Sequence, residues 1–184
     1  MSSDAKHLGS SPMPLGGPPV RLERITDPRS PDIAALNSLL LATPSFRLQT
    51  QGRLPSANEG VSLFQSLPRG ASRDDKFLWG AWSDGELVGC LEVVRHWPQH
   101  DCACIAFIVV VERLHRHGLG AQMVKLSRQR MHAWPGVRRL CLAVAENNGA
   151  ALAFWRRAGF RDTGLREHPT DYTTPLAVLE RPLT

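Results

Sequence analysis

Hydrophobic positions along the chain recur with the periods of strands and helices. Residues 20–26 alternate apolar with polar side chains, which predicts a first strand. Ser30 followed by Pro31 predicts a helix start, because a proline at the first helical position loses no intrahelical hydrogen bond. The pattern from Ser56 to Glu59 is that of a capping box and predicts the start of a second helix. Two helices are therefore expected after the first strand.

The middle of the chain predicts three antiparallel strands. Residues 77–83 and 86–95 flank Asp84-Gly85, a dipeptide that favours a tight hairpin. A second reversal around Pro98 leads into residues 102–111, which are apolar on both faces. Such a run is typical of a central strand, buried from both sides. The three segments together predict a meander.

The second half of the chain alternates helices with strands. Its expected elements are a helix at about residues 118–133, a strand at 139–145, a helix at 148–158, and strands at 161–166 and 175–183. The whole order is β-α-α-β-β-β-α-β-α-β-β. It predicts a mixed α/β fold, with a mostly antiparallel sheet of about seven strands and helices on both faces.

The composition is that of a globular chain with one domain. Of the 184 residues, 42% are hydrophobic, which suffices for a sizeable core. Eleven of the first twenty residues are Gly, Pro or Ser, so we expect residues 1–19 to form a flexible tail and residues 20–184 to form the domain. No apolar run approaches the ~18 residues of a membrane span, and the tail lacks the apolar core of a signal peptide. We therefore expect a cytoplasmic protein with no membrane partner.

The cysteines lie inside apolar, strand-like runs, at Cys90, Cys102, Cys104 and Cys141. This placement predicts buried free thiols in a reducing compartment rather than disulfides. His96 and His100 lie close enough in sequence to suggest a metal site with the neighbouring cysteines. However, Cys102 and Cys104 are two apart on a strand and no Cys-x-x-Cys spacing occurs, so we expect no metal.

Positive charge is concentrated in one part of the chain. Residues 112–161 contain ten Lys or Arg and two acidic residues, a net charge of +8 in a chain whose total is +5. Such a segment indicates a polyanionic ligand. Nucleic acid would also suit it, but no nucleic-acid motif is present, so nucleic acid is not favoured.

A glycine turn follows the central strand directly and opens a helix, from His115 through Gly118 to Gly120. Glycines let backbone N–H groups approach a phosphate, and a helix N-terminus adds partial positive charge. Arg116 and His117 add side-chain donors. The segment is therefore a candidate anion cradle; the alternative is a tight turn with no ligand.

A second strand-to-helix segment makes the pattern specific, with Val144, Asn148, Ala151, Phe154, Trp155, Gly159 and Phe160 in register. Together the two segments resemble the acetyltransferase family known as GNAT (GCN5-related N-acetyltransferases). Its signatures are Arg/Gln-x-x-Gly-x-Gly/Ala at a helix start and Val-x-x-x-Asn-x-x-Ala-x-x-Phe/Leu-Tyr-x-x-x-Gly-Phe. The motifs lie about 30 residues apart, and the resemblance covers essentially the whole domain.

The resemblance implies that acetyl-CoA is the co-substrate. Backbone groups of the central strand would pair with the pantetheine arm, backbone amides of the glycine turn would hold the pyrophosphate, Asn148 would hydrogen-bond the pantetheine, and Trp155 would lie near the thioester sulfur. The strand residues are Ile108, Val109 and Val110; the turn residues are His115, Arg116, His117, Gly118, Leu119 and Gly120.

The chain departs from the family pattern at the catalytic positions. Trp155 stands where the family often has a tyrosine acid, and an indole N–H is too weak an acid for that role. Ala106 and Phe107 occupy the region of a frequent glutamate. Two substitutes are named: Glu146, as a base acting directly or through water, and Tyr172, the chain's single tyrosine, as an acid.

These features predict an N-acetyltransferase that moves acetyl from acetyl-CoA to a primary amine by direct attack in a ternary complex. The acceptor is open: a small molecule, or an amine of a peptide or protein. An acceptor bound as ammonium would favour an entrance lined by carboxylates. The alternative is a non-catalytic acyl-CoA-binding sensor or interaction module, and a homodimer is the assembly expected by analogy with this fold.

Overall fold

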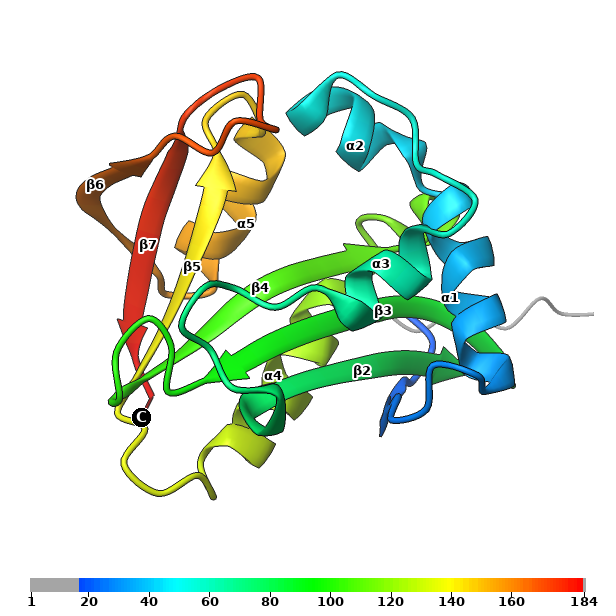
Figure 1. Ribbon diagram of the computed structural model, residues 1–184, viewed down its shortest axis with the longest axis horizontal. Coiled ribbons are helices and arrows are strands. Elements are labelled where there is room, and N and C mark those ends of the chain that lie inside the picture. Colours follow the sequence, from blue (N-terminus) through cyan, green and yellow to red (C-terminus); the bar gives the residue numbers. More distant parts are fainter. Residues whose placement is uncertain (1–16, 184) are drawn as a thin grey trace, which may run out of the picture.

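Within the described residues, seven strands form a single sheet in the order β1-β2-β3-β4-β5-β7-β6 (Figure 1). The computed structural model describes residues 17–183, so most of the expected tail, residues 1–16, lies outside the described residues. The strands are β1 (Arg21–Arg24), β2 (Lys76–Ser83), β3 (Glu86–Arg95), β4 (Cys102–Val110), β5 (Arg139–Ala145), β6 (Arg161–Glu167) and β7 (Leu176–Pro182). Only the β4–β5 pair is parallel, which confirms the expected mixed, mostly antiparallel α/β class.

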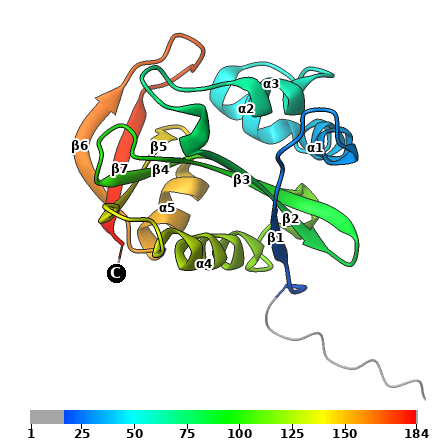
Figure 2. The same cartoon turned by 60° about the horizontal axis from the view of Figure 1, so that its bottom comes forward.

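Helices cover both faces of the sheet (Figure 2). They are α1 (Pro31–Leu41), α2 (Pro44–Gln51), α3 (Glu59–Gln65), α4 (Leu119–Met131) and α5 (Gly149–Arg157), with 3-10 turns η1 (Arg73–Asp75) and η2 (Glu112–Leu114). The first three lie on one face and the last two on the other. Between the layers, side chains such as Leu36, Leu91, Met123 and Leu140 are fully buried. Within residues 17–183, no helix is long and apolar enough to cross a bilayer.

Three helices, not the expected two, connect β1 to β2, because α2 was not predicted. Its first residue is Pro44, and it ends at Gly52, whose φ of 66° places it in the left-handed region. The helix expected from Ser56 begins at Glu59 instead. The Glu59 carboxylate still accepts the Ser56 N–H at 3.0 Å, so the capping-box contact forms while the chain before Glu59 remains a turn.

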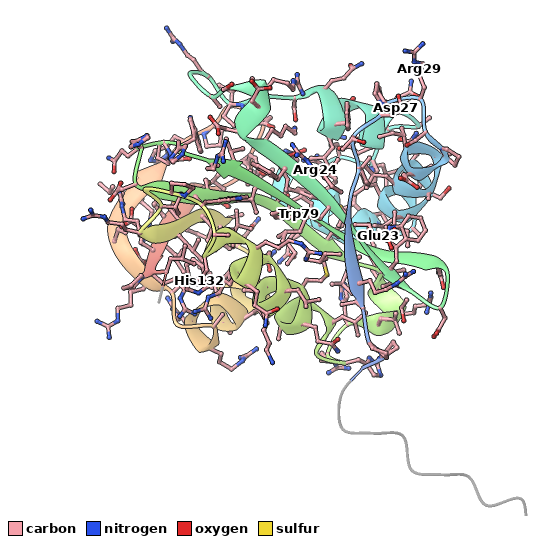
Figure 3. All side chains as sticks on the ribbon, turned by 90° about the horizontal axis from the view of Figure 1, so that it is seen from below. Glu23, Arg24, Asp27, Arg29, Trp79 and His132 are labelled. Carbon is pink, nitrogen blue, oxygen red and sulfur yellow. The ribbon has the colours of Figure 1, made fainter. Side chains whose placement is uncertain are left out.

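The predicted hairpin forms between β2 and β3. Asp84 and Gly85 have φ values of 49° and 81°, the positive values that a two-residue hairpin turn requires at both central positions. On the outer side of β2 lies the edge strand β1, seen from below in Figure 3. Its Arg24 guanidinium lies 4.2 Å from the centre of the Phe77 ring and donates to the Lys76 carbonyl oxygen. These side-chain contacts attach β1 to the start of β2.

Strands β4 and β5 pair only at their first residues. The parallel register runs from Cys102 opposite Arg139 to Cys104 opposite Cys141 and ends there. Beyond it, β4 follows β3 and β5 follows β7. The unpaired facing edges, residues 105–110 and 142–145, are called here the β4–β5 opening.

Candidate active site

A β-bulge shapes β4 where it leaves β5. Glu92 of β3 lies opposite Phe107, but the next β3 residue, Val93, lies opposite Ile105, so Ala106 is an extra residue in β4. A bulge bends its strand and increases the local twist. Ala106 is exposed, whereas Phe107 is 9% exposed. The bulge therefore turns β4 away from β5 at the start of the β4–β5 opening.

The backbone of β4 past the bulge presents unpaired groups to the opening. The Val111 N–H donates to the Val88 carbonyl oxygen of β3 at 2.9 Å. Because the hydrogen-bonding direction alternates along an antiparallel strand, the N–H and C=O groups of Ile108 and Val110 point to the other edge, away from β3. The strand edge is therefore open at both backbone groups of Ile108 and at the Val110 N–H, whereas the Val110 carbonyl oxygen lies 2.8 Å from the His115 Nε2. Val109 contributes a buried side chain between them.

Two histidines fold the loop between β4 and α4 through backbone contacts. The His115 Nε2 lies 2.8 Å from the Val110 carbonyl oxygen, and the His117 Nδ1 lies 2.8 Å from the His115 carbonyl oxygen. Since a carbonyl oxygen only accepts hydrogen bonds, the His115 Nε2 and the His117 Nδ1 each carry a proton. The His117 carbonyl oxygen in turn accepts the Gly17 N–H at 2.6 Å. The two imidazoles therefore hold the loop in place beside the end of β4.

The loop ends in left-handed backbone at two positions. Arg116 has a φ of 63°, which is uncommon for a residue with a Cβ, and Gly118 has a φ of 81° as the N-cap of α4. Left-handed residues turn successive N–H groups toward a common side and form anion-binding concavities. Gly120 has a different role: a Cβ there would lie 3.5 Å from the Phe154 ring of α5. The side chain of Leu119 is buried in the core, so only its backbone faces the turn.

The residues expected on α5 take two different positions. Asn148 caps the helix, with its Oδ1 accepting the Ala151 N–H at 3.0 Å. Trp155 is 4% exposed, and its ring packs edge-on against Phe154 and Phe160 at centroid distances of 4.8 and 5.0 Å. The indole at the tyrosine position of the family motif is therefore also a core side chain.

Helix α2, absent from the sequence prediction, spans the outer end of the β4–β5 opening. At its start the Ser45 N–H donates to Glu112, just after β4, at 3.1 Å. At its end Gln49 and Asn147 exchange hydrogen bonds of 2.7 and 2.8 Å, and the Thr50 carbonyl oxygen accepts the Thr173 N–H at 2.9 Å. The helix thus connects the end of β4 with the turn after β5 and with the β6–β7 loop (Figure 1).

A buried carboxylate lies under α2. Glu59 is 3% exposed and pairs with Arg47 at 2.6 Å and with Arg53 at 3.1 Å. Burial alone would raise the pKa of this carboxyl, but the hydrogen bonds from Arg53 and Ser56 and the charge of Arg47 outweigh it and lower the pKa to about 2. Glu59 is therefore ionised throughout the neutral range.

The Arg47 side chain reaches from α2 toward the sheet. Its guanidinium carbon lies 5.6 Å from the centre of the Phe107 ring and 5.5 Å from that of Phe46, and these rings meet edge to face at 5.2 Å. Arg47, Glu59 and Phe107 line a small cavity together with Val109 of the free β4 edge. The sequence contained a signal for α2, Pro44 and Gly52 at its ends, but none for the meeting of Arg47 with β4.

Tyr172, one of the two expected catalytic residues, lies half-buried in the β6–β7 loop beside the end of α2. Burial raises the pKa of its phenol, and the positive charge of Arg47 opposes that shift. The neighbouring side chain of Asp171 accepts a hydrogen bond from Gln51 of α2 at 2.9 Å. The structure thus brings Tyr172 to the same end of the opening as Arg47.

Glu146, the other expected catalytic residue, follows β5 at the same end of the sheet. Its N–H donates to the Pro175 carbonyl oxygen just before β7. Its carboxylate forms an ion pair with Arg166 of β6 at 2.6 Å and is 43% exposed. The structure places Glu146 near the β6–β7 loop, with its carboxylate engaged by a cation.

The basic segment, the histidine pair and the cysteines noted in the sequence lie outside the β4–β5 opening or are engaged in contacts of their own. Part of the +8 segment is neutralised within the fold, since Arg113 pairs with Glu86 and Arg139 pairs with Asp101 and Glu180. His96 and His100 stack on each other at 4.3 Å, whereas three of the free cysteines pack together with Trp97. Across the described part of the chain, no three His, Cys, Asp or Glu side chains are grouped as metal ligands would be.

Solved structures share this fold. An acetyltransferase from Thermus thermophilus is 24% identical over 89% of this chain and 96% of its own, with a TM-score of 0.69. An acetyl transferase from Salmonella typhimurium, which modifies the N-terminal serine of ribosomal protein L7/L12, is 18% identical over 92% and 97%, with a TM-score of 0.71. The aminoglycoside acetyltransferase AAC(6')-Ib, solved in complex with coenzyme A, is 17% identical over 89% and 95%, with a TM-score of 0.68.

A family model places the chain more firmly than these distant structures do. The model of the acetyltransferase (GNAT) family matches residues 41–160, which is more than half of the chain. The match includes α2, the bulged strand β4, the loop before α4 and the Asn148-to-Phe160 segment. This protein therefore belongs to the GNAT family of acetyltransferases.

Proposed function

We propose that this protein transfers an acetyl group from acetyl-CoA to a primary amine by direct attack in a ternary complex. The observation that carries the proposal is the free edge of β4, which runs straight into a loop with left-handed backbone at Arg116 and Gly118 and then into the start of α4. This arrangement offers a strand edge, an anion-binding concavity and a helix N-terminus in series.

The residues around the opening fit acetyl-CoA. The Ile108 N–H and C=O and the Val110 N–H face the opening and can pair with the amides of the pantetheine arm as an added strand would, while the Val110 carbonyl oxygen is held by His115. Backbone N–H groups of the turn from His115 to Gly120 bind the pyrophosphate, except that of His115, which donates to the Glu112 carbonyl oxygen. The Arg116 guanidinium lies beside them. The Asn148 Oδ1 caps α5, which leaves its Nδ2 to donate to the pantetheine. Trp155 contributes an apolar wall near the sulfur.

The chemistry asks little of the protein beyond positioning and charge stabilisation. When bound, acetyl-CoA supplies an acyl group on a thiolate leaving group. A β4 backbone N–H stabilises negative charge on the carbonyl oxygen as the amine nitrogen bonds to carbon and the carbon–sulfur bond breaks. The Glu146 carboxylate is held in an ion pair by Arg166, so it accepts the amine proton through an intervening water rather than directly. Tyr172 donates its proton to the thiolate and is reprotonated from solvent.

The experiment is thiol release from acetyl-CoA against a panel of amines. An acetyltransferase releases one CoA for each amide formed, and mass spectrometry of the product shows the acceptor gaining an acetyl group. Binding of acetyl-CoA with no release on any amine would favour the alternative, a sensor on the same fold. Trp155→Tyr separates the two further: an enzyme with Trp155 near the sulfur changes its rate, whereas a sensor gains no turnover.

A further inference from the structure

The environment of Arg47 indicates what the acceptor carries besides its amine. We infer that the acceptor is a small amine bearing a carboxylate, and that Arg47 binds that carboxylate; the inference rests on the proposed transferase function. It differs from the sequence expectation of an entrance lined by carboxylates. The cavity that includes Val109 of β4 is lined by a cation, Arg47 of α2, and the buried carboxylate beside it, Glu59, is already paired.

The ion pair of Arg47 leaves most of its hydrogen-bonding capacity unused. The pair joins its Nε to Glu59. In the part of the chain that the structure describes, no oxygen accepts a hydrogen bond from its two terminal nitrogens. Glu59 in turn receives the Arg53 guanidinium and the Ser56 N–H, so its charge is shared among several donors. A planar guanidinium with free terminal nitrogens is suited to binding a carboxylate.

The surroundings of Arg47 strengthen an anionic contact. The guanidinium lies among the rings of Phe46 and Phe107, and its side chain is only 16% exposed. An ion pair formed away from water is screened less than one at the surface. The titratable groups facing it are Glu59 on α3, Tyr172 on the β6–β7 loop, and Cys90 on β3, and of these only Glu59 is negatively charged at neutral pH.

The position of Arg47 ties the carboxylate to the reaction. The cavity it lines includes Val109, which lies between the two β4 residues whose backbone faces the opening. Tyr172, the proposed acid, is close enough for the Arg47 charge to act on its pKa. A carboxylate on Arg47 would therefore hold the acceptor beside the free edge of β4, where the thioester is proposed to bind.

Helix α2, which spans the outer end of the β4–β5 opening, favours a small acceptor over a polypeptide. Helix α2 is hydrogen-bonded to Glu112 at one end and to Asn147 and Thr173 at the other. The cavity beneath it is too small to admit an acceptor without movement of α2. A small molecule requires less displacement of α2 than a polypeptide, which would have to separate the helix from its hydrogen-bond partners at both ends.

The test compares acceptors that differ only in the carboxylate. Free α-, β- and γ-amino acids are each paired with their carboxamides, and thiol release is measured for the protein as it is, for Arg47→Gln and Arg47→Lys, and for Arg29→Gln. Arg29 is exposed on the loop before α1, so Arg29→Gln removes the same charge at a position away from the site (Figure 3). We expect at least one amino acid to exceed its amide in kcat/KM by about 10- to 100-fold, the range for a charged hydrogen bond.

The expected pattern is loss of that preference in Arg47→Gln, partial retention in Arg47→Lys and full retention in Arg29→Gln. Thermal unfolding checks that Arg47→Gln is folded, since Glu59 keeps Arg53 as a partner. Equal rates for acids and amides, or a preference that survives Arg47→Gln, would overturn the inference. So would turnover confined to an N-terminal peptide whose carboxylates are all amidated.

A second readout does not depend on turnover. Calorimetric titration of the CoA-bound protein with the same pairs shows whether the acid binds more tightly than the amide, and whether Arg47→Gln abolishes the difference. If acetyl-CoA binds but no amine releases CoA, the proposed function fails, while this titration still decides whether Arg47 binds a carboxylate. Absence of binding for every amino acid would overturn it.

Discussion

Cys104 of β4 and Cys141 of β5 form the last residue pair between these two strands. After this pair each strand stays with its other neighbour, and the bulge at Ala106 bends β4 away. Two neighbouring strands of a continuous sheet would satisfy each other's backbone groups; here β5 does not pair with Ile108 or Val110 of β4. The opening for a ligand is therefore built into the sheet itself, and its closed end is lined by thiols.

The thiols should be unreactive in the folded protein. Burial raises the pKa of Cys90, and the hydrogen bond to Cys141 together with burial raises that of Cys102. Since the thiolate is the nucleophile, we expect an aromatic disulfide reagent to label none of the four cysteines at pH 7.5 within minutes. In denaturant all four should react at once. Rapid labelling of any cysteine under native conditions would contradict the structure of this region.

A substitution at Arg116, in the left-handed backbone before α4, should affect acetyl-CoA binding more than protein stability. Arg116→Gly relieves left-handed backbone but adds flexibility to the unfolded chain, so the free energy of unfolding should change by less than ~1 kcal/mol. Loss of the guanidinium should weaken acetyl-CoA binding by about 5- to 10-fold. Urea unfolding and calorimetric titration measure the two effects. Arg113→Gly, in the 3-10 turn just before, is the matched control; its binding should be unaffected, because Arg113 pairs with Glu86.

The phenol of Tyr172 should act as the acid. Tyr172→Phe is expected to lower kcat by roughly 100-fold with little change in the KM for acetyl-CoA. Because burial raises the pKa of Tyr172, the phenol stays protonated above its ordinary value of 10, so kcat should not fall on the alkaline side up to that pH. Thr170→Val, in the same loop, should behave like the unmodified protein. An unchanged kcat in Tyr172→Phe would remove this residue from the mechanism.

Acid should destabilise the α2 region through Glu59. Its folded pKa of about 2 lies below the ordinary 4.5, so its ionised form stabilises the fold above pH 4.5, and the contribution is lost as the pH falls toward 2. The pKa difference corresponds to about 3 kcal/mol. Glu59→Gln should therefore be less stable than the unmodified protein at pH 7, and the gap should shrink near pH 2 to 3. Urea unfolding at both pH values shows whether it does.

The strands and the helices carrying the family motifs were predictable because local patterns determine them. Residues 139–145 form a short apolar run after Arg139, and β5 has those bounds. Asp84-Gly85 favours its turn without help from the rest of the chain. Such elements need only hydrophobic period and turn chemistry.

The acceptor side was not predictable in the same way. Only Thr50 is buried in α2, so the helix lacks a clear apolar face and is held by contacts with residues about 70 to 120 positions away. The pairing of Arg47 with Glu59 depends on how α2 and α3 come together, which no spacing encodes. The two histidines also took an unexpected role, since their rings bond to the backbone of the loop.

We expect the β4–β5 opening to bind acetyl-CoA. Isothermal titration of the protein with acetyl-CoA tests it most directly, with Gly118→Val as the comparison, because a β-branched side chain at a φ of 81° disturbs the turn before α4. We expect one site of micromolar affinity, with binding weakened at least tenfold in the variant while the fold is kept. No binding at millimolar acetyl-CoA would contradict it.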